Sequence, residues 1–129
     1  MSRSRTMETA FIQSIDLPAD RAGETWKPFP LFREKTANAR IGCHYSVLAP
    51  GGCPHPPHVH VDEEILVVLD GRATIVLAES PDDPAPRTFA MERGQFSYYP
   101  SGQHHTIRND SERDITYLMF RWSLRRHAN

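Results

Sequence analysis

The sequence predicts an all-β fold, and three features lead to that expectation. Short segments alternate apolar and polar residues with the period of two that a β-strand shows, most clearly in residues 40–48, 72–77 and 115–124. Eleven prolines interrupt the chain, and hydrophobic residues make up 39% of it, which is typical of a turn-rich globular β protein. At 129 residues the chain suits one domain with a single core.

Charge and hydropathy narrow the classes of function. The formal net charge of -1 gives no basic excess for nucleic acid, and no run of charge suggests a membrane surface. No apolar segment approaches the roughly 20 residues that a membrane-spanning helix needs. The beginning, MSRSRTMETA, lacks the apolar centre of a secretion signal. We therefore expect a cytoplasmic protein in which Cys43 and Cys53 are free thiols.

Alternation also predicts which side chains share a face. In residues 40–48, His44 is a candidate fifth ligand of a metal, but it stands opposite the apolar set, so we expect it on the surface or at an interface. In residues 96–99, either the pair Ser97 and Tyr99 or the pair Phe96 and Tyr98 lines the interior, and alternation alone leaves both open. The proline-rich segment 79–87, ESPDDPAPR, is predicted to be a surface loop.

A histidine pair marks the first candidate functional segment, GCPHPPHVHVDEEILVVLDG. His58 and His60 are separated by one residue, so in an extended chain they point the same way and can share one ion. Glu64 reaches the same ion if the chain bends between Val61 and Glu63. These three side chains are candidate metal ligands.

A fourth ligand is expected from a second segment, GQFSYYPSGQHHTIRN. His105 follows the turn Pro100-Ser101-Gly102, which would hold it at the start of a strand. His104 lies beside it, and because successive strand residues face opposite ways, only one of the two can point inward.

The spacing of these residues resembles the two motifs of the cupin superfamily, and of its single-domain metal-binding members in particular. The first motif is matched at Gly52, His58, His60, Glu64 and Gly71, and the second at Gly94, Pro100, Gly102, His105 and Asn109. The resemblance implies a small double-stranded β-helix, or jelly-roll, barrel. It also implies one divalent metal ion on three histidines and one glutamate, and it selects His105 over His104. Histidine ligands suit Fe, Mn, Ni, Zn and Cu alike, so the metal stays open.

The expected organisation has four parts. Residues 1–10 are expected to be a disordered N-terminus, and residues 125–129 a frayed tail. Residues 38–124 form the cupin barrel. Residues 11–37, in which prolines argue against a central strand, form an arm that covers the barrel as an edge strand or builds a homodimer interface. An outer sheet face, apolar on several strands, is a second reason to expect a homodimer.

The cavity is expected to take a small molecule. If Tyr117, Met119 and Ile107 point inward, they supply an apolar wall, and Arg121 on the same face would hold a substrate carboxylate. The alternative places Arg121 at the rim, paired with an acidic neighbour.

Two classes of function remain. One is a metal-dependent enzyme, such as a dioxygenase, isomerase or lyase, acting on a small chelating organic acid. The other is a non-catalytic module that binds or senses an acid or sugar. Candidate acid-base residues for the enzyme are Tyr98, Tyr99, Tyr45 and His104.

Overall fold

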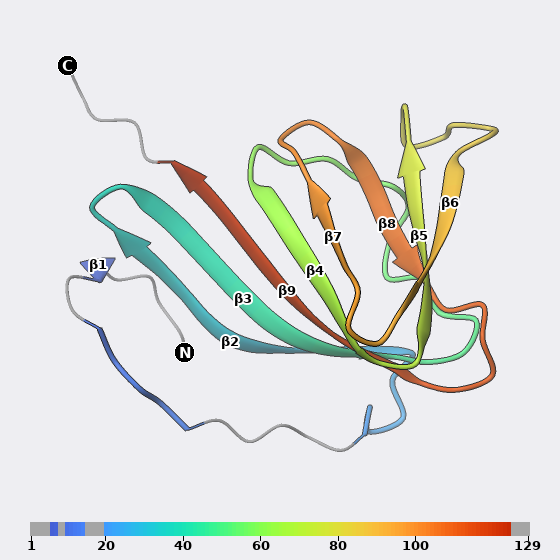
Figure 1. The fold of residues 1–129 in the computed structure, drawn as a ribbon, viewed down its shortest axis with the longest axis horizontal. Helices are drawn as coiled ribbons and strands as arrows, with labels where there is room; N and C mark the ends of the chain where they lie inside the picture. The colour runs from blue at the N-terminus through green and yellow to red at the C-terminus, as the bar shows by residue number, and fades with distance from the viewer. Residues whose placement is uncertain (1–5, 8–9, 15–19, 125–129) are drawn as a thin grey trace.

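Two β-sheets face each other in the computed structural model, which describes residues 6–7, 10–14 and 20–124 (Figure 1). No helix occurs in the described residues, so none of them forms an apolar helix able to span a membrane. The prediction of a frayed tail lies outside the described residues, and that of a disordered N-terminus lies largely outside them. The predicted all-β jelly-roll architecture is confirmed.

The larger sheet has six strands and the smaller has three. In spatial order the larger sheet contains β1 (Thr6–Met7), β2 (Trp26–Thr36), β3 (Ala39–Leu48), β9 (Ile115–Leu124), β4 (Glu63–Asp70) and β7 (Phe96–Tyr99). The smaller sheet contains β6 (Arg87–Glu92), β5 (Arg72–Ala78) and β8 (His104–Arg108). All pairs are antiparallel except that of β1 with β2. In Figure 1 the sheets meet at the lower end and splay apart at the upper end.

The core lies between the two sheets. It is formed by apolar side chains from both sheets, which explains why one face of each strand is apolar. Its buried members are Leu48, Leu66, Val68, Ala73, Ile75, Met91, Tyr99, Ile107, Ile115 and Tyr117. The inner face of β7 is therefore the one that carries Ser97 and Tyr99, whereas Phe96 and Tyr98 are exposed.

Most expected elements are present with small changes in their bounds. The strands predicted at 40–48, 72–77 and 115–124 correspond to β3, β5 and β9, and the proline-rich loop lies between β5 and β6. Both cysteines are free, Cys43 buried and Cys53 exposed.

Within the arm expected over residues 11–37, β2 is a strand of the larger sheet. It pairs with β3 from Trp26 to Lys35, so the expected boundary at residue 38 falls in the turn between two strands of one sheet. The prolines at 28 and 30 are accommodated because β1 pairs with β2 only at Lys35 and Thr36. At the prolines β2 is thus the edge of the described sheet, where a missing N–H leaves no neighbouring strand without a donor.

The segment that carries the first histidines runs beside β8. Backbone hydrogen bonds join Gly51 and Gly52 to Asn109 at one end, and His58 to His105 at the other. Asn109 is fully buried, and its side-chain Nδ2 donates to the carbonyl oxygens of Leu48 and Arg113. This asparagine therefore fixes a turn.

Two glycines with similar backbone angles offer a matched stability test. Gly71 (φ +88°) and Gly94 (φ +85°) both lie in the left-handed region, where an alanine costs roughly 1–2 kcal/mol. A Cβ on Gly71 would also lie 2.5 Å from Ile115 Cγ2 and 2.9 Å from the Asp114 carbonyl oxygen, whereas a Cβ on Gly94 meets nothing within 4 Å. We expect Gly71→Ala to cost about 1–3 kcal/mol more than Gly94→Ala in urea unfolding. Equal losses would contradict this account.

Candidate metal centre

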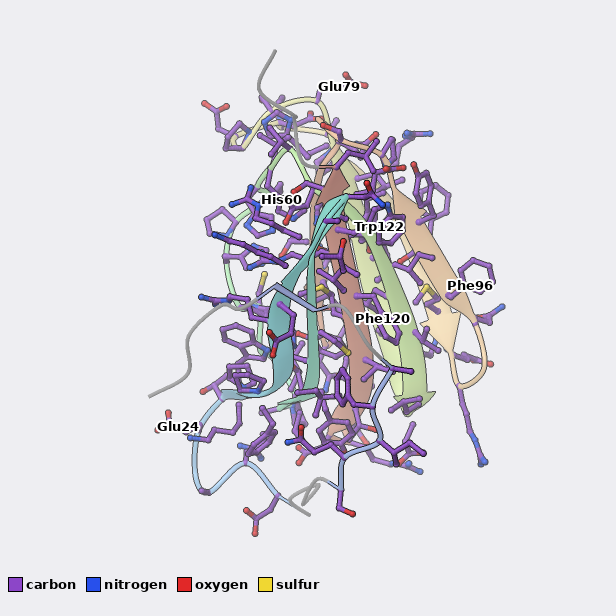
Figure 2. All side chains as sticks on the ribbon, turned by 90° about the vertical axis from the view of Figure 1, so that its left-hand side faces the viewer. Glu24, His60, Glu79, Phe96, Phe120 and Trp122 are labelled. Atoms are coloured by element: carbon purple, nitrogen blue, oxygen red, sulfur yellow. The ribbon has the colours of Figure 1, made fainter. Side chains whose placement is uncertain are left out.

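Three imidazoles converge between the two sheets. Potential ligand nitrogens of His58, His60 and His105 lie within 4.8 Å of one another. His58 and His60 come from the segment that precedes β4, and His105 is the second residue of β8. Figure 2 shows His60 in the half of the molecule that carries Glu79, away from Glu24. The predicted pairing of the two histidine segments is thus present.

Backbone carbonyl groups orient two of the rings. The Nδ1 of His60 lies 3.0 Å from the Asp62 carbonyl oxygen, and the Nδ1 of His105 lies 2.8 Å from that of Gln103. A carbonyl oxygen accepts only, so each Nδ1 carries the proton and donates it. In both rings this leaves Nε2 with its lone pair directed to the centre, the arrangement typical of histidine ligands.

Glu64 adds a carboxylate to the three imidazoles. Its Oε1 lies 3.1 Å from His60 Nε2, and its Oε2 lies 3.4 Å from His105 Nε2. The carboxylate is buried on the inner face of β4, at the strand's second residue. The chain bends at Val61 and Asp62, immediately before β4, as the sequence interpretation required.

The charges of the cluster are mutually dependent. Burial opposes ionisation of Glu64, but the imidazoles of His105 and His60 beside it hold the pKa of the carboxyl at about 2. The Glu64 carboxylate in turn raises the pKa of His60. Burial, together with the neighbouring His55, His105 and His60, lowers the pKa of His58 to about 4. One anionic carboxylate therefore faces a set of imidazoles of which His58 is neutral at pH 7.

One buried nitrogen shows that the protein groups alone do not complete this arrangement. His105 Nε2 is buried without a hydrogen-bond partner among the described residues, because its 3.4 Å separation from Glu64 lacks hydrogen-bond geometry. The Tyr99 ring stacks on that imidazole, with centroids 4.0 Å apart, and so fixes its plane. A metal ion is the species that accepts several imidazole lone pairs and a carboxylate at one point, so the donor set fits a metal.

A cavity of about 330 Å³ opens beside the cluster. Its wall combines the cluster with apolar and basic side chains from both sheets. The lining residues are Trp26, Pro28, Pro30, Arg33, Gly42, Cys43, His44, His55, His58, His60, Glu64, Leu66, Tyr99, His105, Thr106, Ile107, Tyr117, Met119 and Arg121.

All four residues expected to contact a substrate line this cavity, namely Tyr117, Met119, Ile107 and Arg121. Tyr117 Oη accepts a hydrogen bond of 2.9 Å from Trp26 Nε1. Arg121 Nε lies 3.6 Å from Asp62 Oδ2, so the arginine both lines the cavity and has an acidic neighbour. The two readings of Arg121 derived from the sequence are therefore compatible.

The four candidate acid-base residues are placed differently. Tyr99 lines the cavity, but Ser97 Oγ donates to its hydroxyl and burial raises its pKa above the ordinary value. Tyr98 is exposed and donates to Glu63. Tyr45 stands opposite Leu118 on the outer face of the larger sheet. Neither Tyr98, Tyr45 nor His104 is among the residues that line the cavity.

His44 lines the cavity, so the expectation that it lies at the surface or an interface is wrong. It stands opposite Met119 in the sheet, and its Nδ1 lies 2.7 Å from Ser46 Oγ. Burial lowers the pKa of His44, and the field of Glu64 partly opposes that shift. His44 does lie on the face of β3 opposite the apolar set, but at this end of the barrel that polar face is the inner one.

Arg33 also lines the cavity, and the sequence analysis did not identify it. It lies on β2, beyond an irregularity in the pairing with β3. No pattern in the local sequence marks that irregularity.

Comparison with known proteins agrees with this architecture. The family model described as Cupin domain matches residues 44–121. No curated protein shows a significant sequence match to the chain. A Cupin 2 conserved barrel domain protein from Salinispora arenicola is similar in structure, with a TM-score of 0.61 and 27% identity over 86% of this chain and 91% of that one.

Two further structures are similar in fold at lower identity. The Cupin_2 domain of an XRE family transcriptional regulator from Enterobacter cloacae has a TM-score of 0.58 and 19% identity, over 76% of this chain and 96% of that one. Oxalate oxidase in complex with the substrate analogue glycolate has a TM-score of 0.54 and 23% identity, over 63% of this chain. The present chain spans only 41% of that oxidase. By its family match and its fold, the chain belongs to the cupin family.

Proposed function

We propose that His58, His60, Glu64 and His105 hold one divalent transition metal ion, and that the chain is an enzyme acting on a small chelating organic acid. The observation that carries the proposal is the buried, unpartnered Nε2 of His105 within a cluster of three imidazoles and a carboxylate. A buried polar atom without a partner is costly, and a metal ion would satisfy it.

When bound, such a metal polarises the oxygens of a chelating ligand and so activates it for oxygenation, isomerisation or elimination. Three neutral imidazoles and one carboxylate leave a divalent ion with a net charge of about +1, which favours an anionic ligand. The wall residues support the same class of ligand, because Arg121 offers donors for a carboxylate while Tyr117, Met119 and Ile107 contact its carbon atoms. Glycolate, a 2-hydroxy acid bound by the structurally similar oxalate oxidase, belongs to this class.

His44 is our candidate for moving a proton in this cavity. Its Nδ1 is engaged by Ser46, which leaves Nε2 to meet a molecule in the cavity. Histidine is the side chain that most often acts as a general acid or base. This role favours an enzyme over a purely binding protein.

The second candidate function is a metal-dependent sensor that binds an acid or sugar without converting it. It is favoured by the similarity to a regulator's cupin domain, of which this chain covers 96%. Incubating metal-loaded protein with 2-hydroxy and 2-oxo acids, and following oxygen uptake and products by NMR, separates the two. Tight binding without any conversion would favour the sensor.

The metal proposal is tested by elemental analysis of the purified protein and by thermal unfolding. We expect about one transition-metal ion per chain, and a higher melting temperature with metal because the ion binds only the folded form. His105→Ala should weaken metal binding by roughly 10-fold to 100-fold or more. The matched control is His104→Ala, which removes the adjacent imidazole outside the cavity. The proposal is wrong if the protein carries no metal and its melting is unchanged by Mn, Fe, Ni or Zn.

The ligand class is tested by a thermal-shift screen of acids, sugars and phenols with metal-loaded and metal-free protein. We expect 2-oxo and 2-hydroxy acids to stabilise the metal-loaded form far more than neutral sugars do. Arg121→Met should remove most of that gain while the metal remains bound, since Arg121 lines the cavity but is not one of the four proposed ligands. If sugars stabilise the protein best, or if Arg121→Met leaves acid binding unchanged, the carboxylate anchor is wrong.

We also propose that the chain forms a homodimer through the outer face of its larger sheet. Trp26 packs on the core and so does not belong to this interface. The outer face instead carries partly exposed apolar side chains on β3, β9 and β4, two of which, Phe120 and Trp122, are labelled in Figure 2. The register places on this face Ile41, Tyr45, Ile65, Val67, Leu118, Phe120 and Trp122.

Light scattering at micromolar concentration tests the dimer. We expect the wild type to have twice the chain mass of 14.7 kDa. Phe120→Glu should have a mass closer to that of one chain, because dimer formation would bury the new charge in the interface. Phe89→Glu, at an exposed position on β6 of the smaller sheet, is the control and should leave the mass unchanged. A wild-type mass of 14.7 kDa would refute the dimer.

A further inference from the structure

A β-bulge in β2 turns Arg33 toward the cavity. Trp26, Pro28 and Pro30 stand opposite Leu48, Ser46 and His44 and line the inner face. Uninterrupted alternation from these residues would place Arg33 on the outer face. The register shifts between Pro30 and Phe32, so that Arg33 stands opposite Gly42 and lines the cavity. Bulges of this kind often redirect a side chain beside a functional site.

Arg33 and Arg121 flank Gly42 in one row across three strands. Gly42 stands opposite Arg33 on one side and opposite Arg121 on the other, and all three line the cavity. A Cβ at Gly42 would lie 3.5 Å from Arg121 Nε and 3.6 Å from its Cγ. The Arg121 side chain therefore passes over Gly42, and a larger residue there would occupy the space that this side chain uses. The same row continues from Arg121 to Glu64.

The balance of charge at this end of the cavity is positive. Among the described residues no carboxylate forms an ion pair with Arg33, and Arg121 has Asp62 at 3.6 Å, beyond hydrogen-bond distance. The next cross-strand pair toward the open end, Lys35 and Arg40, is also cationic. Once a divalent ion is bound beside Glu64, the two guanidinium groups, Asp62 and the metal centre together carry a charge of about +2.

We infer that Arg33 and Arg121, across Gly42, form a subsite for a second anionic group of the ligand, a carboxylate or a phosphate. The inference rests on the proposed function, because the first anionic group of the same molecule is the chelating end at the metal. The subsite would make the protein selective for dianionic acids over monoanionic ones, since guanidinium pairs bind both carboxylate and phosphate with directed hydrogen bonds.

Calorimetry of the metal-loaded protein with three 2-hydroxy acids tests the subsite. The probes are lactate with one carboxylate, malate with a second carboxylate, and 3-phosphoglycerate with a phosphate. We expect malate or 3-phosphoglycerate to bind at least about 10-fold more tightly than lactate, and which of the two binds more tightly identifies the second group. Arg33→Gln should remove most of this preference. Gly42→Val should do the same by closing the space, in a protein shown to be folded by circular dichroism.

The matched control is Arg72→Gln, which removes the same charge from an exposed position on β5 and should keep the preference. If the wild type binds lactate and the dianions equally, or if Arg33→Gln keeps the preference, the subsite is wrong while the proposed function stands. If none of the three acids binds the metal-loaded protein, the proposed ligand class fails, and the subsite fails with it.

Discussion

The candidate metal centre depends on one pair of backbone hydrogen bonds between segments far apart in the chain. The His58 N–H donates to the His105 carbonyl, and the His105 N–H donates to the His58 carbonyl, each at 3.0 Å. This bridge sets two imidazoles side by side, and the bend before β4 then brings Glu64 to them. Asn109 secures the other end of the same pairing through Gly51 and Gly52. The site is therefore built on sheet geometry, which holds it more rigidly than free loops would.

The sequence predicted the parts of the structure that fixed spacing determines. The strands β3, β5 and β9 follow from alternation, and the convergence of His58, His60 and His105 follows from two motifs with set intervals. The inner faces were harder to predict. At Tyr99 either alternation phase was possible, and at His44 the usual rule that the apolar face is the inner one fails, because a cavity and not a packed core lies beside it.

The course of β2 was predicted only in part. The prolines argue against a central strand and favour an edge strand, and β2 is the edge of the described sheet where they occur. The bulge between Pro30 and Phe32 leaves no local signal in the sequence. Arg33 was therefore missed, since the bulge reverses the phase of alternation within a single strand.

The bulge also divides β2 into two halves with different structural roles. The half from Trp26 to Pro30 is tied to the core through the hydrogen bond from Trp26 to Tyr117, whereas the half from Arg33 to Thr36 is placed by the hairpin with β3. The extra residue at the bulge lets each half keep its own register with β3. Side chains at the cavity mouth can therefore be substituted without disturbing the packing of Trp26, so the charge of this part of the cavity is independent of the core.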